Sequence, residues 1–135
     1  MNYSRASDGR LQELTMQRLM IADSADIVRK VGKRILSEIG FLVLEAGSAR
    51  DALLRCETEL PNIIIVDAGL DGALDLITNI RALPEGKSVR IYYCVVEADL
   101  KTMMAGKRAG ADDFLLKPFD RKILTSIFTG SAVAA

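Results

Sequence analysis

Three side chains able to take part in chemistry each follow a short apolar run of the chain. Asp23 comes shortly after the first run, Asp67 directly after the third and Lys117 directly after the fifth, while Glu97 lies just beyond the fourth. The chain contains no histidine. This excludes a Ser-His-Asp or Cys-His triad, a histidine metal site and a phosphohistidine on the chain itself. Carboxylates and lysine must therefore carry any chemistry.

Each of these residues also has an ordinary structural interpretation. Asp23 could cap the helix that follows its strand, since aspartate is a preferred N-cap residue. Lys117 precedes Pro118 and could be a surface lysine at a turn. Asp67 is harder to explain in this way, because a carboxylate at the end of an all-apolar strand is costly without a partner.

Composition limits the classes of protein to which the chain can belong. It has 135 residues, half of them apolar, and 18 basic side chains balance 18 acidic ones. This describes a single globular domain without the net positive field of nucleic-acid or membrane-surface binders. We therefore expect no nucleic-acid or membrane partner. Cys56 and Cys94 lie in apolar surroundings without CxxC spacing, which predicts core thiols in a reducing compartment, the cytoplasm.

The elements that position these residues repeat five times along the chain. Apolar runs typical of buried strands alternate with amphipathic stretches; the runs are 19–21, 41–44, 63–66, 91–96 and 114–116. Five such units predict an α/β fold, a doubly wound five-stranded parallel sheet flanked by five helices, (βα)5 and flavodoxin-like. Function in such sheets is found at the carboxyl ends of the strands. We expect the domain to span 18–130, with a flexible extension at 1–17 and a flexible tail at 131–135.

Local signals place two of the helices. Ile27, Val31, Ile35 and Ile39 recur every four residues and predict the inward face of the first helix, which Gly40 would end. Ser48, followed three residues later by an aspartate, resembles a capping box that opens the next helix. The fourth helix is expected over about 98–109.

These residues together resemble the receiver domain of two-component response regulators, of the CheY-like single-domain type. The matching residues are Asp23, Asp67, the segment 110–114 (Gly-Ala-Asp-Asp-Phe) and the segment 117–119 (Lys-Pro-Phe). The separations between the two aspartates and the lysine also agree with the family. The resemblance covers 18 to about 128.

The resemblance implies a role for each matching residue. Asp67 would be the phosphoacceptor, attacking the phosphorus of a phosphohistidine on a partner kinase. Mg²⁺ would be bound by Asp23, Asp67 and the backbone carbonyl of Gly69, and the Lys117 ammonium would contact the phosphoryl group. The Lys117–Pro118 peptide is often cis in the family.

Two positions and one loop depart from the family pattern. Ala22 stands where a second acidic residue is usual, and Val95 replaces the Ser or Thr whose hydroxyl binds the phosphoryl group. The loop 68–72 lacks the usual proline and is shorter. Phe114 takes the place of the aromatic switch residue, but it has no hydroxyl. We therefore expect weak Mg²⁺ binding and a weak or permanently set switch.

Two function hypotheses follow, neither of them enzymatic. The first is a single-domain response regulator of a phosphorelay. It would accept a phosphoryl group on Asp67 from a histidine kinase or phosphotransfer protein. Its output would be contact between a protein target and the surface formed by the fourth helix, fifth strand and fifth helix. The second is a pseudo-receiver that binds or sequesters a partner without phosphorylation, which Ala22 and Val95 favour. A small phosphatase on the same sheet would need a general acid or a cofactor loop, and no GxGxxG or P-loop is present.

Overall fold

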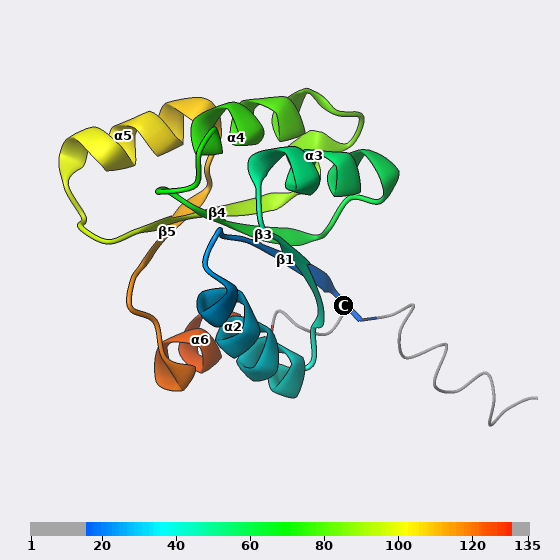
Figure 1. Ribbon diagram of the computed structural model, residues 1–135, viewed down its shortest axis with the longest axis vertical. Coiled ribbons are helices and arrows are strands. Elements are labelled where there is room, and N and C mark those ends of the chain that lie inside the picture. Colours follow the sequence, from blue (N-terminus) through cyan, green and yellow to red (C-terminus); the bar gives the residue numbers. More distant parts are fainter. Residues whose placement is uncertain (1–15, 131–135) are drawn as a thin grey trace, which may run out of the picture.

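A computed structural model, which describes residues 16–130, has a five-stranded parallel sheet in the order β2-β1-β3-β4-β5 (Figure 1). The strands are β1 (Arg18–Ala22), β2 (Leu42–Ala46), β3 (Ile63–Asp67), β4 (Arg90–Val95) and β5 (Asp113–Leu116). The helices are α2 (Asp26–Ile39), α3 (Ala49–Thr58), α4 (Ala73–Ala82), α5 (Leu100–Ala109) and α6 (Arg121–Phe128), with a 3-10 turn, η1, at Gly86–Ser88. The fold class predicted from the sequence is confirmed. The tail at 131–135 and residues 1–15 of the predicted extension lie outside the described residues.

Helices cover both faces of the sheet. Figure 1 shows α3, α4 and α5 on one face and α2 with α6 on the other. Along β3, Ile64 and Val66 join the core under α3 to α5, while Ile63 and Ile65 join the core under α2 and α6. In a strand that is buried on both faces every side chain points into a core, which explains the uninterrupted apolar run before Asp67.

Backbone and side-chain caps fix where the helices begin and end. Gly40 ends α2 with φ of 126°, a conformation that side chains rarely adopt. The Ser48 hydroxyl accepts a hydrogen bond from the backbone N–H of Asp51, so both local predictions are confirmed. The helix expected from position 98 begins instead at Leu100, because Asp99 caps it by accepting from the N–H of Thr102 at 2.9 Å.

The predicted inward face of α2 is only half correct. Ile35 is buried and Ile39 packs against the same core, but the side chains of Ile27 and Val31 are 70% and 45% exposed. These two side chains line an open pocket opposite the segment 117–119 and are not enclosed by the core. The periodicity was that of one face, but packing partners exist along only part of its length.

Arg81 of α4 links three segments of the chain through hydrogen bonds. Its guanidinium donates to the carbonyl oxygens of Gly86, Val89 and Gly110 and to a carboxylate oxygen of Asp112 at 2.6–2.9 Å. The same Asp112 oxygen accepts from the N–H of Ile91. Asp112 is therefore a structural acceptor that joins α4, β4 and the start of β5.

The remaining sequence expectations concern cysteines and membranes. Cys56 and Cys94 are both buried free thiols, as predicted. Within the described part of the chain, no helix has the length and apolarity needed to cross a bilayer.

Candidate functional site

The carboxyl ends of β1, β3 and β5 bring Asp23, Asp67 and Lys117 together. Asp67 is the last residue of β3, and the other two directly follow their strands. Interstrand hydrogen bonds continue past the strand ends: the N–H of Asp23 donates to Ala46 O at 3.1 Å, and that of Lys117 donates to Val95 O at 2.8 Å. The positions of these side chains are therefore set by the sheet itself.

Lys117 bridges the two aspartates. Its Nζ lies 2.6 Å from Asp23 Oδ2 and 3.0 Å from Asp67 Oδ1. The side chains of Asp23, Asp67 and Lys117 are 4%, 14% and 18% exposed. Burial alone lowers the pKa of Lys117, but hydrogen bonds to both carboxylates and their charges outweigh it, so the pKa is raised. The ammonium stays charged at neutral pH.

The two aspartates differ in how their oxygens are engaged. Asp23 Oδ1 accepts a hydrogen bond from the N–H of Ala25 at 2.9 Å, and Oδ2 accepts from Lys117. Ala25, not Asp23, is the N-cap residue of α2, so the capping interpretation of Asp23 is wrong. For Asp67, Oδ1 faces Lys117, whereas no hydrogen bond from the described residues reaches Oδ2. Oδ2 is therefore the oxygen available to an incoming group.

Gly69 lies beside this available oxygen. A Cβ atom built on Gly69 would be 3.3 Å from Asp67 Oδ2, closer than an ordinary contact. The loop doubles back here, since the N–H of Leu70 donates to Asp67 O at 3.0 Å. A side chain at this position would crowd the exposed side of the carboxylate.

Arg29 of α2 holds the loop that carries Asp23. Its Nη1 donates to Asp23 O at 2.6 Å, and its Nε donates to Glu45 Oε1 at 3.2 Å. Both side chains are largely buried. Hydrogen bonds from Lys30 and Arg29, together with the charges of Lys30 and Lys33, lower the pKa of Glu45 despite its partial burial. Sequence reasoning missed this pair, because Arg29 and Glu45 are distant in the chain and neither belongs to a recognised motif.

The two single residues that depart from the family pattern, Ala22 and Val95, are fully enclosed. Ala22 is 0% and Val95 2% exposed, and neither brings a side-chain oxygen to the site. Across residues 16–130, no group of three or more Cys, Asp or Glu side chains is arranged to hold a metal ion. With both carboxylates bonded to Lys117, the residues present do not fit an octahedral Mg²⁺ site as they stand.

The expected switch residue Phe114 is half-buried. It pairs with Tyr93 of β4 in the sheet register and packs against the core under α3 to α5. Tyr93 itself is buried beneath α5, where a Cβ on Gly106 would approach its ring to 2.5 Å. The helix α5 thus rests directly on an aromatic side chain of the strand that ends at Val95.

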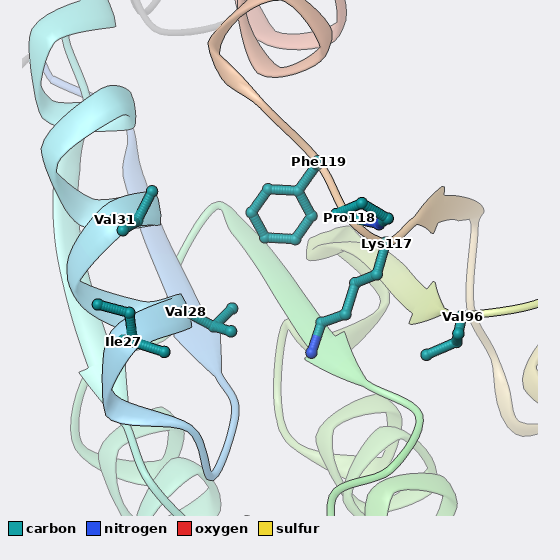
Figure 2. Close-up of a pocket in the computed structure, with 7 residues that line it drawn as sticks. All are labelled: Ile27, Val28, Val31, Val96, Lys117, Pro118 and Phe119. Carbon is teal, nitrogen blue, oxygen red and sulfur yellow. The ribbon is translucent and has the colours of Figure 1, made fainter.

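An apolar pocket of about 400 Å³ adjoins Lys117. Figure 2 shows Ile27, Val28 and Val31 of α2 on one side and the segment 117–119 on the other. The Lys117–Pro118 peptide in its wall is cis, as the resemblance implied. The exposed isoleucine and valine of α2 therefore line a hollow next to the site.

Comparison with known proteins agrees with this arrangement. The sequence model of the response regulator receiver domain family matches residues 19–129 of this chain. The chain belongs to the response regulator receiver family. It is 33% identical over 105 residues to the KDP operon transcriptional regulatory protein KdpE of Escherichia coli K12. That match covers 77% of this chain and 46% of KdpE. As a receiver domain, the chain is a signalling module of two-component systems.

Two solved structures show the same receiver fold. A putative response regulator from Chloroflexus aurantiacus is 30% identical with a TM-score of 0.75, over 83% of this chain and 94% of that one. The receiver domain of the sensor histidine kinase PA1611 from Pseudomonas aeruginosa PAO1 is 24% identical with a TM-score of 0.74, over 82% and 93%. The latter structure holds a magnesium ion in its active-site cleft. The chain spans less than half the length of the curated transcriptional regulators that it matches.

Proposed function

We propose that this receiver domain accepts a phosphoryl group on Asp67 from the phosphohistidine of a histidine kinase or phosphotransfer protein. In the step, Asp67 Oδ2 attacks phosphorus, the bond between phosphorus and the imidazole nitrogen breaks, and an acyl phosphate forms. The observation that carries the proposal is the placement of Asp67: a partly exposed carboxylate with one oxygen bonded to Lys117 and the other unengaged. Phosphoryl transfer needs an in-line oxygen nucleophile and positive charge near the equatorial oxygens.

Lys117 supplies that positive charge in the proposal. Its ammonium is already within 3.0 Å of Asp67 Oδ1 and is held there from the other side by Asp23. A cation fixed before the reaction stabilises developing charge without reorganising during the step. Asp23 is therefore a positioning residue for Lys117 in the proposed reaction.

Magnesium enters the proposal only as a weakly bound ligand. The PA1611 receiver holds this metal in its cleft, and the groups of this chain that would bind it are Asp23, Asp67 and the Gly69 carbonyl. Ala22 leaves the set with two carboxylates, and fewer anionic ligands lower the affinity for a hard dication. We expect occupancy only at millimolar or higher concentration, as an order of magnitude.

The proposed output is contact with a protein target through α5, β5 and α6. Leu100, Met104 and Leu116 expose apolar side chains on these elements. The valine at position 95 cannot donate a hydrogen bond to a phosphoryl group, so the link from Asp67 to this surface is weak.

Phosphoryl transfer to Asp67 is tested with a small-molecule donor. Incubation with phosphoramidate and Mg²⁺, followed by intact mass measurement, should add one phosphoryl group to the native protein slowly and in low yield. Asp67→Asn should remain unmodified, whereas Asp75→Asn, which removes an exposed carboxylate on α4, should label like the native protein. Labelling that persists in Asp67→Asn, or none in the native protein, would refute the proposal. The unlabelled result would leave a phosphorylation-independent binding module as the function.

A further inference from the structure

The cation that neutralises the acidic pair in this site belongs to the chain itself. Lys117 Nζ lies within 3.0 Å of one oxygen from each of Asp23 and Asp67, between two largely buried carboxylates. Without a cation between them, two carboxylates this close together would repel each other, and one of them would take up a proton. The ammonium removes that repulsion without any ion from solution.

Both oxygens of Asp23 already accept hydrogen bonds. Its Oδ1 is held by the N–H of Ala25 and its Oδ2 by Lys117, at 2.9 and 2.6 Å. A divalent cation bound to Oδ2 would share that oxygen with the ammonium, and the two neighbouring positive charges would repel each other. The two cations therefore compete for the same atom.

The net charge of the site favours the Lys117 ammonium over a divalent cation. Two carboxylates and Lys117 sum to one negative charge, so adding a divalent cation with Lys117 retained would leave one positive charge in a mostly buried space. A carboxylate at position 22 would cancel it, but this position is a fully buried alanine. In a region of low dielectric such a surplus is unfavourable.

We propose that the ammonium of Lys117, not a divalent metal, is the resident cation of the Asp23–Asp67 pair, and that metal binds only by displacing it. The inference rests on the proposed function only in treating these three residues as one site. Phosphoryl labelling of Asp67 and metal affinity are separate measurements, so either can fail while the other stands.

Metal affinity of the purified protein tests the proposal directly. Mn²⁺ binding is measured by electron paramagnetic resonance in the native protein, in Lys117→Met and in Lys107→Met. The control removes the same charge from an exposed position near the end of α5. Lys117→Met should bind Mn²⁺ at least tenfold more tightly than the native protein, and Lys107→Met should stay within about twofold. Equal or weaker binding in Lys117→Met would overturn the proposal.

Thermal unfolding adds a second readout. Without metal, Lys117→Met should melt below the native protein, because its carboxylates repel each other. Mg²⁺ should restore much of that loss in the variant and hardly change the native melting temperature. A native protein stabilised by Mg²⁺ as strongly as Lys117→Met would contradict the proposal.

The native protein gives a test that does not depend on a variant folding. Proton–nitrogen spectra of lysine ammonium groups are recorded while Mg²⁺ is added and backbone amide shifts report occupancy. Displacement requires the Lys117 ammonium signal to shift or vanish with the same midpoint as the Asp23 amide, while the Lys107 signal stays unchanged. Saturation of the amide shifts with an unchanged Lys117 signal would overturn the proposal.

Discussion

Lys117 is bonded more closely to Asp23 than to the proposed phosphoacceptor, at 2.6 Å against 3.0 Å. The deeper of the two carboxylates thus fixes the ammonium, and the more exposed one keeps an oxygen for attack. This division of roles depends on the absence of a third carboxylate, which the buried Ala22 explains. It leads to the first prediction.

Restoring a carboxylate at position 22 should create a metal site. Ala22→Asp adds an anionic ligand at the carboxyl end of β1, next to Asp23, so we expect Mg²⁺ binding to tighten by at least tenfold, which corresponds to about 1.4 kcal/mol. Without metal, the buried charge should lower the melting temperature. Titration with Mg²⁺, followed by backbone amide shifts, measures the affinity of the native protein and of Ala22→Asp.

The matched control for this change is Ala82→Asp, which adds the same charge at an exposed position at the end of α4. It should leave Mg²⁺ affinity unchanged. If Ala22→Asp binds Mg²⁺ no better than this control, then position 22 does not face the site.

Stability should fall in alkaline solution because of the buried thiols. Burial raises the pKa of Cys56 to about 11, assisted by the Glu57 charge, and that of Cys94 to about 12. Thiols in the unfolded chain ionise near pH 8.5, so the stabilisation is complete below that pH and is lost as the pH rises toward the folded pKa values. Each thiol should remove on the order of 2 kcal/mol from the free energy of unfolding by pH 11.

Urea denaturation at a series of pH values measures this loss. Cys94→Ala should be less stable at pH 7, because a buried side chain is shortened, but its free energy of unfolding should decline less steeply above pH 8.5. A slope identical to that of the native protein would show that the Cys94 thiol does not titrate in this range.

Removing the Arg81 guanidinium should destabilise the whole domain. Arg81→Met leaves the carbonyl oxygens of Gly86, Val89 and Gly110 without their donor, together with the Asp112 carboxylate. Unsatisfied acceptors of this kind predict a loss of about 2–4 kcal/mol. Arg50→Met, at an exposed position on α3, should change stability by less than about 0.5 kcal/mol. Equal denaturation midpoints for the two variants would argue against this role.

The alternation of strands and helices could be predicted because apolar runs typical of strands alternate with amphipathic stretches, and the central strand β3 is apolar on both faces. The apolar run from Ile63 to Val66 indicated a parallel strand covered on both faces, and the carboxyl ends of parallel strands lie along one edge of the sheet. The proximity of Asp23, Asp67 and Lys117 followed from that rule. The pocket between α2 and the segment 117–119 did not, so the prediction that Ile27 and Val31 lie in the core is wrong.

Long-range polar contacts were the other part that sequence reasoning could not reach. Arg29 with Glu45 and Arg81 with Asp112 are separated by 16 and 31 residues, and periodicity reports nothing about such pairs. The partner of a charged side chain can be identified only when the backbone positions of both residues are known.

The last prediction concerns the missing hydroxyl at the end of β4. Val95 lies 2% exposed beside the site and forms no hydrogen bond through its side chain, so a phosphoryl group on Asp67 cannot draw the following loop inward. Beryllofluoride bound to Asp67 should therefore change the affinity for any partner of the α5, β5 and α6 surface by less than about tenfold, or 1.4 kcal/mol of coupling. Val95→Thr keeps the shape and adds the hydroxyl, so it should enlarge the effect. Amide shifts along α5 and β5, measured with and without the analogue, report the same coupling before a partner is known. They should spread beyond the site in Val95→Thr and stay local in the native protein. Shifts that reach α5 equally in both proteins would show that Tyr93 or another neighbour carries the signal without a hydroxyl at position 95.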